Sequence, residues 1–300
     1  MNGSCENAEQ SAVADDANAR SSIKPSRSSF LKSQEFYARA IFGILLAVLA
    51  IASAVGGGIF FALFIGIGTI AAAREWHRMV DDRGFAPEML VTALTIVAVL
   101  ASVLAAPKEW WGAVALAVGA GLAAIVAVVR KGSPFWHAFG VVYIGVGALS
   151  LLTLRIEAPY GQWVVLGIFV VIWAADTGAW LAGSLIGGPK LVPVLSPNKT
   201  WAGFLGGIAL AAVGAAIYIF ILHGDPVSAA WVAAALAVIG HSGDLFESWV
   251  KRQFKRKNSG GLIPGHGGVL DRIDSMLFVA PLVAAIVLFI GINSLFGAHP

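Results

Sequence analysis

A charged, glycine-rich segment runs from Ser248 to Ser275 between two apolar stretches, and reads SWVKRQFKRKNSGGLIPGHGGVLDRIDS. It holds six Lys and Arg, two Asp and one His, in a chain of which only 12% is charged. Cationic side chains bind phosphate groups, carboxylates suit a divalent metal ion, and glycines let the backbone approach a ligand closely. This combination predicts phosphate chemistry.

Two further carboxylates, Asp176 and Asp244, lie inside apolar stretches. A charge at the centre of a bilayer costs roughly 2.5–3.5 kcal/mol on insertion scales, so such residues usually have a function. The second of them begins a helical series at i, i+3, i+4 and i+7 that places four polar side chains on one face. That series is Asp244, Glu247, Ser248 and Lys251. The alternative is structural: each carboxylate reaches the surface or pairs with a nearby lysine.

Asp271 and Asp274 are three residues apart just before the last apolar stretch, so a helix there would point both side chains the same way. Magnesium prefers oxygen ligands and often takes only one or two carboxylates together with phosphate oxygens. We therefore expect Mg²⁺, or a pair of cations, at Asp244, Asp271 and Asp274, with Asp176 as a weaker candidate. The alternative is that Asp271 is a helix N-cap paired on the surface with Arg272.

Two polar segments offer groups that bind phosphate. The glycine run at 264–268 could cradle an anion with successive backbone N–H groups, and the loop at 189–203 gathers hydroxyl, amide and ammonium donors. The alternatives are a basic loop that only sets topology and contacts lipid headgroups, a histidine that only braces the turn, and a turn whose Thr200 caps the next helix. The residues expected to hold phosphate groups are Ser196, Lys199, Thr200, Ser248, Lys251, Arg252, Lys257, His266, Gly267, Gly268 and Arg272.

These residues are set in a very apolar chain. Of its 300 residues 58% are hydrophobic, and the mean hydropathy is +0.81, so we predict an all-α integral membrane protein. The charge-free segment 40–73 is too long for one span of a bilayer core of roughly 30 Å, and the glycines at 56–58 divide it. The result is about nine transmembrane helices: two in 40–73, then 89–106, 111–129, 136–154, 163–186, 203–222, 228–250 and 276–296.

The distribution of positive charge predicts the orientation. With the N-terminus in the cytoplasm, 18 of the 20 Lys and Arg lie on the cytoplasmic side, and Lys108 and Arg155 lie outside. The C-terminus is then outside, and nearly every candidate residue lies at the cytoplasmic surface. Residues 1–35 are polar and without periodicity, which predicts a disordered cytoplasmic tail before a membrane domain at 36–300. The one cysteine, Cys5, predicts no intrachain disulfide.

The segment at 248–274 resembles the signature of phosphatidate cytidylyltransferases, also called CDP-diacylglycerol synthases. That signature has a serine before a Lys-Arg pair, a glycine-rich His-Gly-Gly and an Asp-Arg-x-Asp, which correspond here to SWVKR, PGHGG and LDRID. Three motifs that begin before this segment occur in the same order as in the family. They are DTGA from Asp176, SPNKT from Ser196 and GDLFES from Gly243. The chain departs from the family's pattern at Asn198, Ala202 and Asn258, where the family usually has Lys, Glu and Asp.

The resemblance implies transfer of a cytidylyl group from CTP to phosphatidic acid, with Mg²⁺ as cofactor and the catalytic half at about 163–300. It implies a bacterial enzyme of the cytoplasmic (inner) membrane, in contact with membrane lipid and without a nucleic-acid partner. A homodimer is compatible with the sequence, although no residue pattern specifies one. The alternative function is a proton- or cation-coupled membrane transporter that uses Asp176 and Asp244. The catalytic residues expected for the transferase are Asp244, Asp271, Asp274, Lys251 and Arg272.

Overall fold

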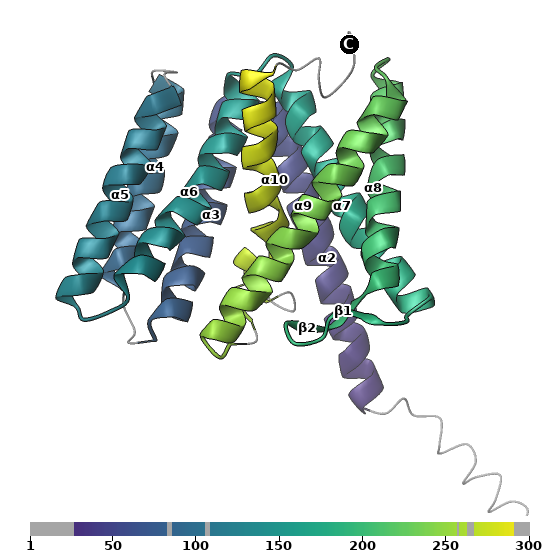
Figure 1. Cartoon of the computed structure of the whole chain (residues 1–300), viewed down its shortest axis with the longest axis horizontal. Coiled ribbons are helices and arrows are strands. Elements are labelled where there is room, and N and C mark those ends of the chain that lie inside the picture. Colours follow the sequence, from purple (N-terminus) through teal and green to yellow (C-terminus); the bar gives the residue numbers. More distant parts are fainter. Residues whose placement is uncertain (1–26, 83–85, 106–108, 257, 263–266, 291–300) are drawn as a thin grey trace, which may run out of the picture. The chain divides into compact units, whose positions relative to one another are not determined.

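The computed structural model describes residues 27–82, 86–105, 109–256, 258–262 and 267–290. This part of the chain forms nine α-helices and one two-stranded sheet (Figure 1), which confirms the predicted all-α class apart from one small β-hairpin. The helices are α2 (Arg27–Gly56), α3 (Gly58–Val80), α4 (Pro87–Ala105), α5 (Glu109–Val129), α6 (Pro134–Ile156), α7 (Gly161–Leu185), α8 (Trp201–Ile221), α9 (Pro226–Gln253) and α10 (Leu270–Phe289). The strands are β1 (Lys190–Val192) and β2 (Ser196–Thr200).

The helices correspond to the predicted apolar stretches. Among the described residues, eight helices, α3 to α10, are long and apolar enough to cross a membrane. The first predicted span coincides with α2, whose apolar part, Ile41–Gly56, is shorter than the other eight. The break between α2 and α3 falls at Gly57, whose φ of 120° is a conformation that favours glycine. The glycine run therefore divides the long apolar segment as predicted.

The chain divides into two compact units, residues 1–45 and 46–300. Within the second unit, consecutive helices run in opposite directions, so α3, α5, α7 and α9 all end at the side where the β-hairpin lies (Figure 1). The charge distribution predicts that this side faces the cytoplasm, and the orientation stays a prediction. Of the predicted tail, residues 1–26 lie outside the described part, and α2 begins at Arg27.

Small residues let the helices of the C-terminal half approach closely. A Cβ atom on Gly243 of α9 would lie 2.8 Å from the carbonyl oxygen of Asp274 in α10. In the same way, a Cβ on Gly207 of α8 would lie 2.8 Å from the carbonyl oxygen of Ala175 in α7. Close backbone approach at small residues is the usual way for membrane helices to pack. It brings the polar side chains of α9 and α10 within reach of one another.

An aromatic cluster packs α3 and α6 against α9. The indole of Trp76 in α3 is fully buried and donates from Nε1 to the carbonyl oxygen of Trp136, 2.9 Å away. Around it lie Phe139 and Tyr143 of α6, and Tyr143 contacts Phe246 of α9 at 5.5 Å between ring centroids. Such ring pairs add to the area that they bury. The cluster fixes the end of α3 beside the charged part of α9.

Candidate active site

A cavity of about 260 Å³ lies between the hairpin and helices α7, α8 and α9. Asp176 of α7 and Asp244 of α9 both line it, so the structure brings together the two carboxylates that the sequence places in apolar stretches. Lys199 and Thr200 of β2 also line it, and the Lys199 ammonium pairs directly with the Asp244 carboxylate. The cavity therefore combines two carboxylates, a cation and a hydroxyl with apolar lining residues such as Leu191 and Phe204.

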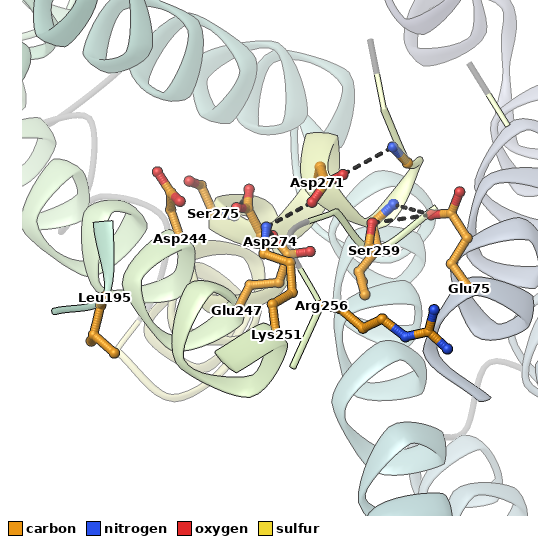
Figure 2. A network of polar contacts seen from close by, with 12 residues as sticks. Glu75, Leu195, Asp244, Glu247, Lys251, Arg256, Ser259, Asp271, Asp274 and Ser275 are labelled. Carbon is orange, nitrogen blue, oxygen red and sulfur yellow. Dashed lines mark hydrogen bonds and ion pairs between the residues drawn. The ribbon is translucent and has the colours of Figure 1, made fainter. Parts of the chain in front are cut away.

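A second group of charged side chains adjoins this cavity where α9 and α10 meet (Figure 2). Lys251 Nζ lies 2.7 Å from Asp271 Oδ1 and 3.3 Å from Glu247 Oε2, so one ammonium bridges the two helices. Asp274 lies one helical turn beyond Asp271 and faces Asp244 and Glu247 (Figure 2). We call Asp244, Glu247, Lys251, Asp271 and Asp274 the acidic cluster.

The acidic cluster carries more negative than positive charge. It has four carboxylates, and three of them, those of Asp244, Glu247 and Asp271, pair with the ammonium groups of Lys199 and Lys251. Glu247 is fully buried, and its Oε1 has no hydrogen-bond partner within the described part of the chain. Asp274 is 7% exposed, and its Oδ1 accepts the backbone N–H of Ser275 at 2.7 Å. Buried like charges are unfavourable unless a cation or a proton compensates them.

The cluster fits a magnesium ion by its donors. No group of three or more His, Cys, Asp or Glu in the described ranges is already arranged around a metal position. Magnesium does not require such a cage, because it commonly takes one or two carboxylates and completes its shell with water and phosphate oxygens. Glu247 Oε1 and the carboxylate of Asp274 supply oxygen donors of that kind in a net negative environment.

The hairpin carries the second set of predicted residues. Strands β1 and β2 are antiparallel, with Lys190 opposite Thr200 and Val192 opposite Ser196. The predicted N-cap is confirmed, because Thr200 Oγ1 accepts the N–H of Gly203 at 3.0 Å. Lys199 and Thr200 line the cavity, whereas Ser196 lies at the far end of β2 and does not.

The remaining predicted residues lie in the loop before α10, on α9 and α10, or outside the described part of the chain. Gly268 N–H donates to Asp271 Oδ2 at 2.9 Å, so this donor serves the loop itself, and the N-cap of α10 is Val269 rather than Asp271. Gly267 has a φ of 83°, as a glycine turn requires. Arg252 Nε reaches the carbonyl oxygen of Leu195 in the hairpin turn at 3.4 Å. Ser248 is half-buried on α9, Arg272 is exposed on α10, and Lys257 and His266 lie outside the described residues.

Comparison with known proteins identifies the family of this chain. A family model described as "Cytidylyltransferase family" matches residues 37–290. The chain belongs to this family. It is 43% identical over 169 residues to a phosphatidate cytidylyltransferase of Brucella suis biovar 1 (strain 1330), a match that covers 55% of this chain and 61% of the relative.

A second relative comes from another bacterium. The phosphatidate cytidylyltransferase of Staphylococcus saprophyticus subsp. saprophyticus is 42% identical over 147 residues, which is 48% of this chain and 55% of that protein. The chain thus spans between half and two thirds of the length of these curated relatives.

Three residues of this candidate site are not predicted from the sequence. The sequence predicts only an ordinary i,i+4 pair between Glu247 and Lys251. In the structure that pair forms, and Glu247 is also buried in the acidic cluster. From the sequence, a lone histidine at position 241 is expected to be a packing residue. In the structure His241 lines the cavity, and its buried Nε2 has no hydrogen-bond partner within the described part. Glu75 of α3 reaches the beginning of α10. Glu75 lies just after the charge-free segment 40–73 and beside Arg74, so the sequence does not distinguish it from the charges of an ordinary loop.

Proposed function

We propose that this protein transfers a cytidylyl group from CTP to phosphatidic acid and forms CDP-diacylglycerol and pyrophosphate. The supporting observation is the acidic cluster, which adjoins a cavity that Lys199 and Thr200 also line. Family membership and the names of the relatives give independent support. Residues 176–274, which contain the motifs, provide every side chain of this arrangement.

In the proposed reaction, a phosphate oxygen of phosphatidic acid attacks the α-phosphorus of CTP. A new P–O bond forms as the bond between the α-phosphorus and the oxygen bridging to the β-phosphate breaks, and pyrophosphate carries that electron pair away. A phosphate monoester is already an anion near neutral pH, because its second pKa is about 6, so no general base is needed. The principal task of the protein is to hold two polyanions in line and to offset their charge.

The cations of the site suit that task. Lys199 lies in the cavity wall, and Lys251 lies between α9 and α10, both next to carboxylates. We assign these two ammonium groups to phosphate oxygens of the nucleotide. Arg252 and Arg272, which are exposed on α9 and α10, are assigned to the phosphates that project beyond the cluster.

Mg²⁺ is the proposed cofactor. When bound, it offsets the charge on the phosphate oxygens during in-line transfer. Asp244, Asp271 and Asp274 are assigned as its ligands, and the buried Glu247 joins them on the evidence of its position. Asp176 lines the adjacent cavity and is a weaker candidate for a second cation.

The proposed location is the bacterial cytoplasmic membrane. Eight long apolar helices in the described part and relatives from bacteria support it. The lipid substrate then lies in the bilayer and CTP in the cytoplasm, which agrees with a charged site at the end of the helices. The homodimer stays a prediction from the sequence.

A transporter gains no support from this arrangement. Carriers that use intramembrane carboxylates need them along a path through the bundle. Here Asp176 and Asp244 line one cavity, and Lys199 pairs with the second of them. The acidic cluster adjoins this cavity instead of continuing along the helices.

Pyrophosphate release by the purified protein in detergent tests the proposal. We expect release that requires CTP, phosphatidic acid and Mg²⁺ together, and that falls more than about 100-fold in Asp271→Asn. The matched control is Asp225→Asn, which removes a carboxylate at the N-cap of α9, at the opposite end of that helix. Release without phosphatidic acid, or none from folded wild-type protein, would contradict the transfer.

A further inference from the structure

Glu75 connects α3 to the beginning of α10, although the two lie far apart in the sequence. Its side chain is almost fully buried, and Oε2 accepts the backbone N–H of Leu270 at 2.9 Å (Figure 2). Ser259 Oγ, from the segment after α9, lies 3.5 Å from the same oxygen. A carboxylate at this position also interacts favourably with the N-terminal end of a helix dipole.

The loop closes around this carboxylate from two sides. A Cβ atom on Gly260 would overlap with Glu75 Oε1, and one on Gly268 would lie 2.5 Å from Oε2. Both positions therefore require glycine for space as long as the carboxylate remains where it is. Gly260 and Gly268 thus leave room for the side chain of Glu75.

The carboxylate is held on a rigid support. The next residue, Trp76, is fully buried in the aromatic cluster and bonded to the backbone of α6. Gly140 of α6 makes room for its indole. The end of α3 cannot shift without disrupting this packing, so Glu75 is a fixed point for whatever binds to it.

The backbone N–H of Leu270, which Glu75 binds, is adjacent to the acidic cluster. Leu270 immediately precedes Asp271, whose Oδ2 accepts the N–H of Gly268 and whose Oδ1 meets Lys251. Asp274 follows one turn later. Any displacement of the first turn of α10 would move both aspartates relative to α9.

We propose that Glu75 is a positioning residue that holds the first turn of α10 so that Asp271 and Asp274 meet the carboxylates of α9. This inference rests on the proposed function in one respect, the metal site that the aspartates are assigned to form. It assigns no contact between Glu75 and a substrate. Residues that orient ligand-binding side chains typically change metal affinity or activity by about 10- to 100-fold when removed.

Glu75→Ala removes the acceptor, Glu75→Asp withdraws it by one methylene, and Glu75→Gln keeps an oxygen at the same reach. The matched control is Glu88→Ala, which removes another fully buried glutamate from the neighbouring helix α4. For each variant we would measure Mn²⁺ affinity by electron paramagnetic resonance, hydrogen exchange at Leu270, thermal unfolding and pyrophosphate release. Mn²⁺ serves as the spectroscopic probe for the magnesium site.

We expect Glu75→Ala to weaken Mn²⁺ binding about 10- to 100-fold and to accelerate exchange at Leu270. Glu75→Asp should show the same changes to a smaller extent, and it provides the test if the alanine variant does not fold. Glu75→Gln should restore Mn²⁺ affinity to within about threefold of wild type, because its oxygen still accepts the N–H of Leu270. Glu88→Ala should lower the unfolding temperature and leave Mn²⁺ affinity unchanged.

Wild-type Mn²⁺ affinity in Glu75→Ala or Glu75→Asp, with only a lower unfolding temperature, would overturn the inference and leave a structural role. Failure of the proposed function gives a different pattern. In that case wild-type protein releases no pyrophosphate, while Mn²⁺ affinity and exchange at Leu270 still respond to Glu75→Ala, which supports the positioning role.

Discussion

Two polar clusters are buried in the same helical bundle, and they differ in how their charges are balanced. The first lies on α3, α4 and α6, where His77 Nδ1 is 2.7 Å from His137 Nδ1 and His77 Nε2 is 2.7 Å from Thr92 Oγ1. Next to it, the buried Glu88 pairs with Arg130 at 2.9 Å. The second is the acidic cluster of α9 and α10.

The first cluster is closed in charge, although Glu88 Oε1 is buried without a hydrogen-bond partner among the described residues. Thr92 has one hydroxyl proton, which it donates to the carbonyl oxygen of Glu88 at 2.9 Å, so His77 Nε2 must be the donor to Thr92. His77 Nδ1 then accepts from His137, and neutral rings satisfy the whole chain of bonds. With one carboxylate facing one guanidinium, no charge is left over.

The acidic cluster has the opposite character. It holds four carboxylates, with only two lysines, Lys251 and the neighbouring Lys199, to balance them. Glu247 Oε1, like Glu88 Oε1, is buried with no hydrogen-bond partner in the described segments, so the charge count is what differs. A balanced cluster stabilises the packing of helices, whereas an unbalanced one is costly until a cation arrives. The difference teaches that charge balance, rather than burial or polarity alone, separates a structural cluster from a candidate site.

The largest effect that we expect comes from Asp274→Asn. Loss of this carboxylate should reduce pyrophosphate release by about 100-fold or more, because it removes a proposed magnesium ligand. It also relieves repulsion with its buried neighbours, so the unfolding temperature should stay equal or rise. Activity and thermal unfolding measured on the same preparation test both statements. A drop in unfolding temperature without loss of activity would show that the acidic cluster, like the first one, only stabilises the helix packing. The distinction between the two clusters would then be wrong.

Lys199→Met should have the next largest effect. It removes the ammonium that pairs with Asp244 in the cavity lining and leaves this part of the site more negative. We expect the KM for CTP to rise by about tenfold or more, because a polyanionic ligand then meets uncompensated carboxylates. Steady-state kinetics measure this, with Lys190→Met of β1 as the control for a lysine of the same hairpin. Equal KM values in the two variants would place Lys199 outside the nucleotide site.

The comparison also shows what the sequence can predict. Asp176 and Asp244 stand out because they lie in apolar stretches, and helical spacing predicts that Asp271 and Asp274 share one face. The break at Gly57 and the cap at Thr200 are equally local. Each of these predictions depends on residues within a few positions of one another.

Other features depend on contacts between distant segments. Glu75 meets Ser259 and Leu270 after 184 and 195 residues, so no local pattern connects them. Glu247 forms the helical pair with Lys251 that the spacing allows, and only the approach of α10 shows that it also belongs to the acidic cluster. The hairpin has a three-residue first strand, and a segment of that length carries too little pattern to be distinguished from a turn.

Thr92→Val should have an effect on stability alone. The substitution keeps the shape of the side chain but deprives His77 Nε2 of its partner, which should cost about 1–3 kcal/mol. Thr95→Val is the matched control one turn away, because Thr95 Oγ1 bonds only to the carbonyl oxygen of Val91 among the contacts described. Chemical unfolding in detergent should separate the two variants, while their pyrophosphate release per folded molecule should equal that of wild type. A loss of activity in Thr92→Val would show that the closed cluster takes part in the reaction.

The smallest effect is expected at Asp225, an exposed carboxylate that belongs to neither cluster. It caps α9 by accepting from the N–H groups of Val227 and Ser228 at 3.0 and 3.3 Å. Hydrogen bonds with Ser228 and Val227 lower the pKa of this carboxyl from its ordinary value of 3.8. The ionised form is therefore favoured in the folded protein, and its contribution to stability is present above pH 3.8 and is lost as the pH falls through the lower, folded-state pKa.

Asp225→Ala removes both the cap and this pH dependence, whereas Asp225→Asn keeps an acceptor without a titrating charge. Thermal unfolding followed from neutral pH down to about pH 3 should show wild type losing stability relative to Asp225→Asn only at the acid end. Pyrophosphate release at neutral pH should be the same in all three proteins. If Asp225→Ala destabilised the protein as much as Thr92→Val, an exposed cap would matter as much as a buried, closed cluster. Charge balance in the interior would then not be what distinguishes the regions of this bundle.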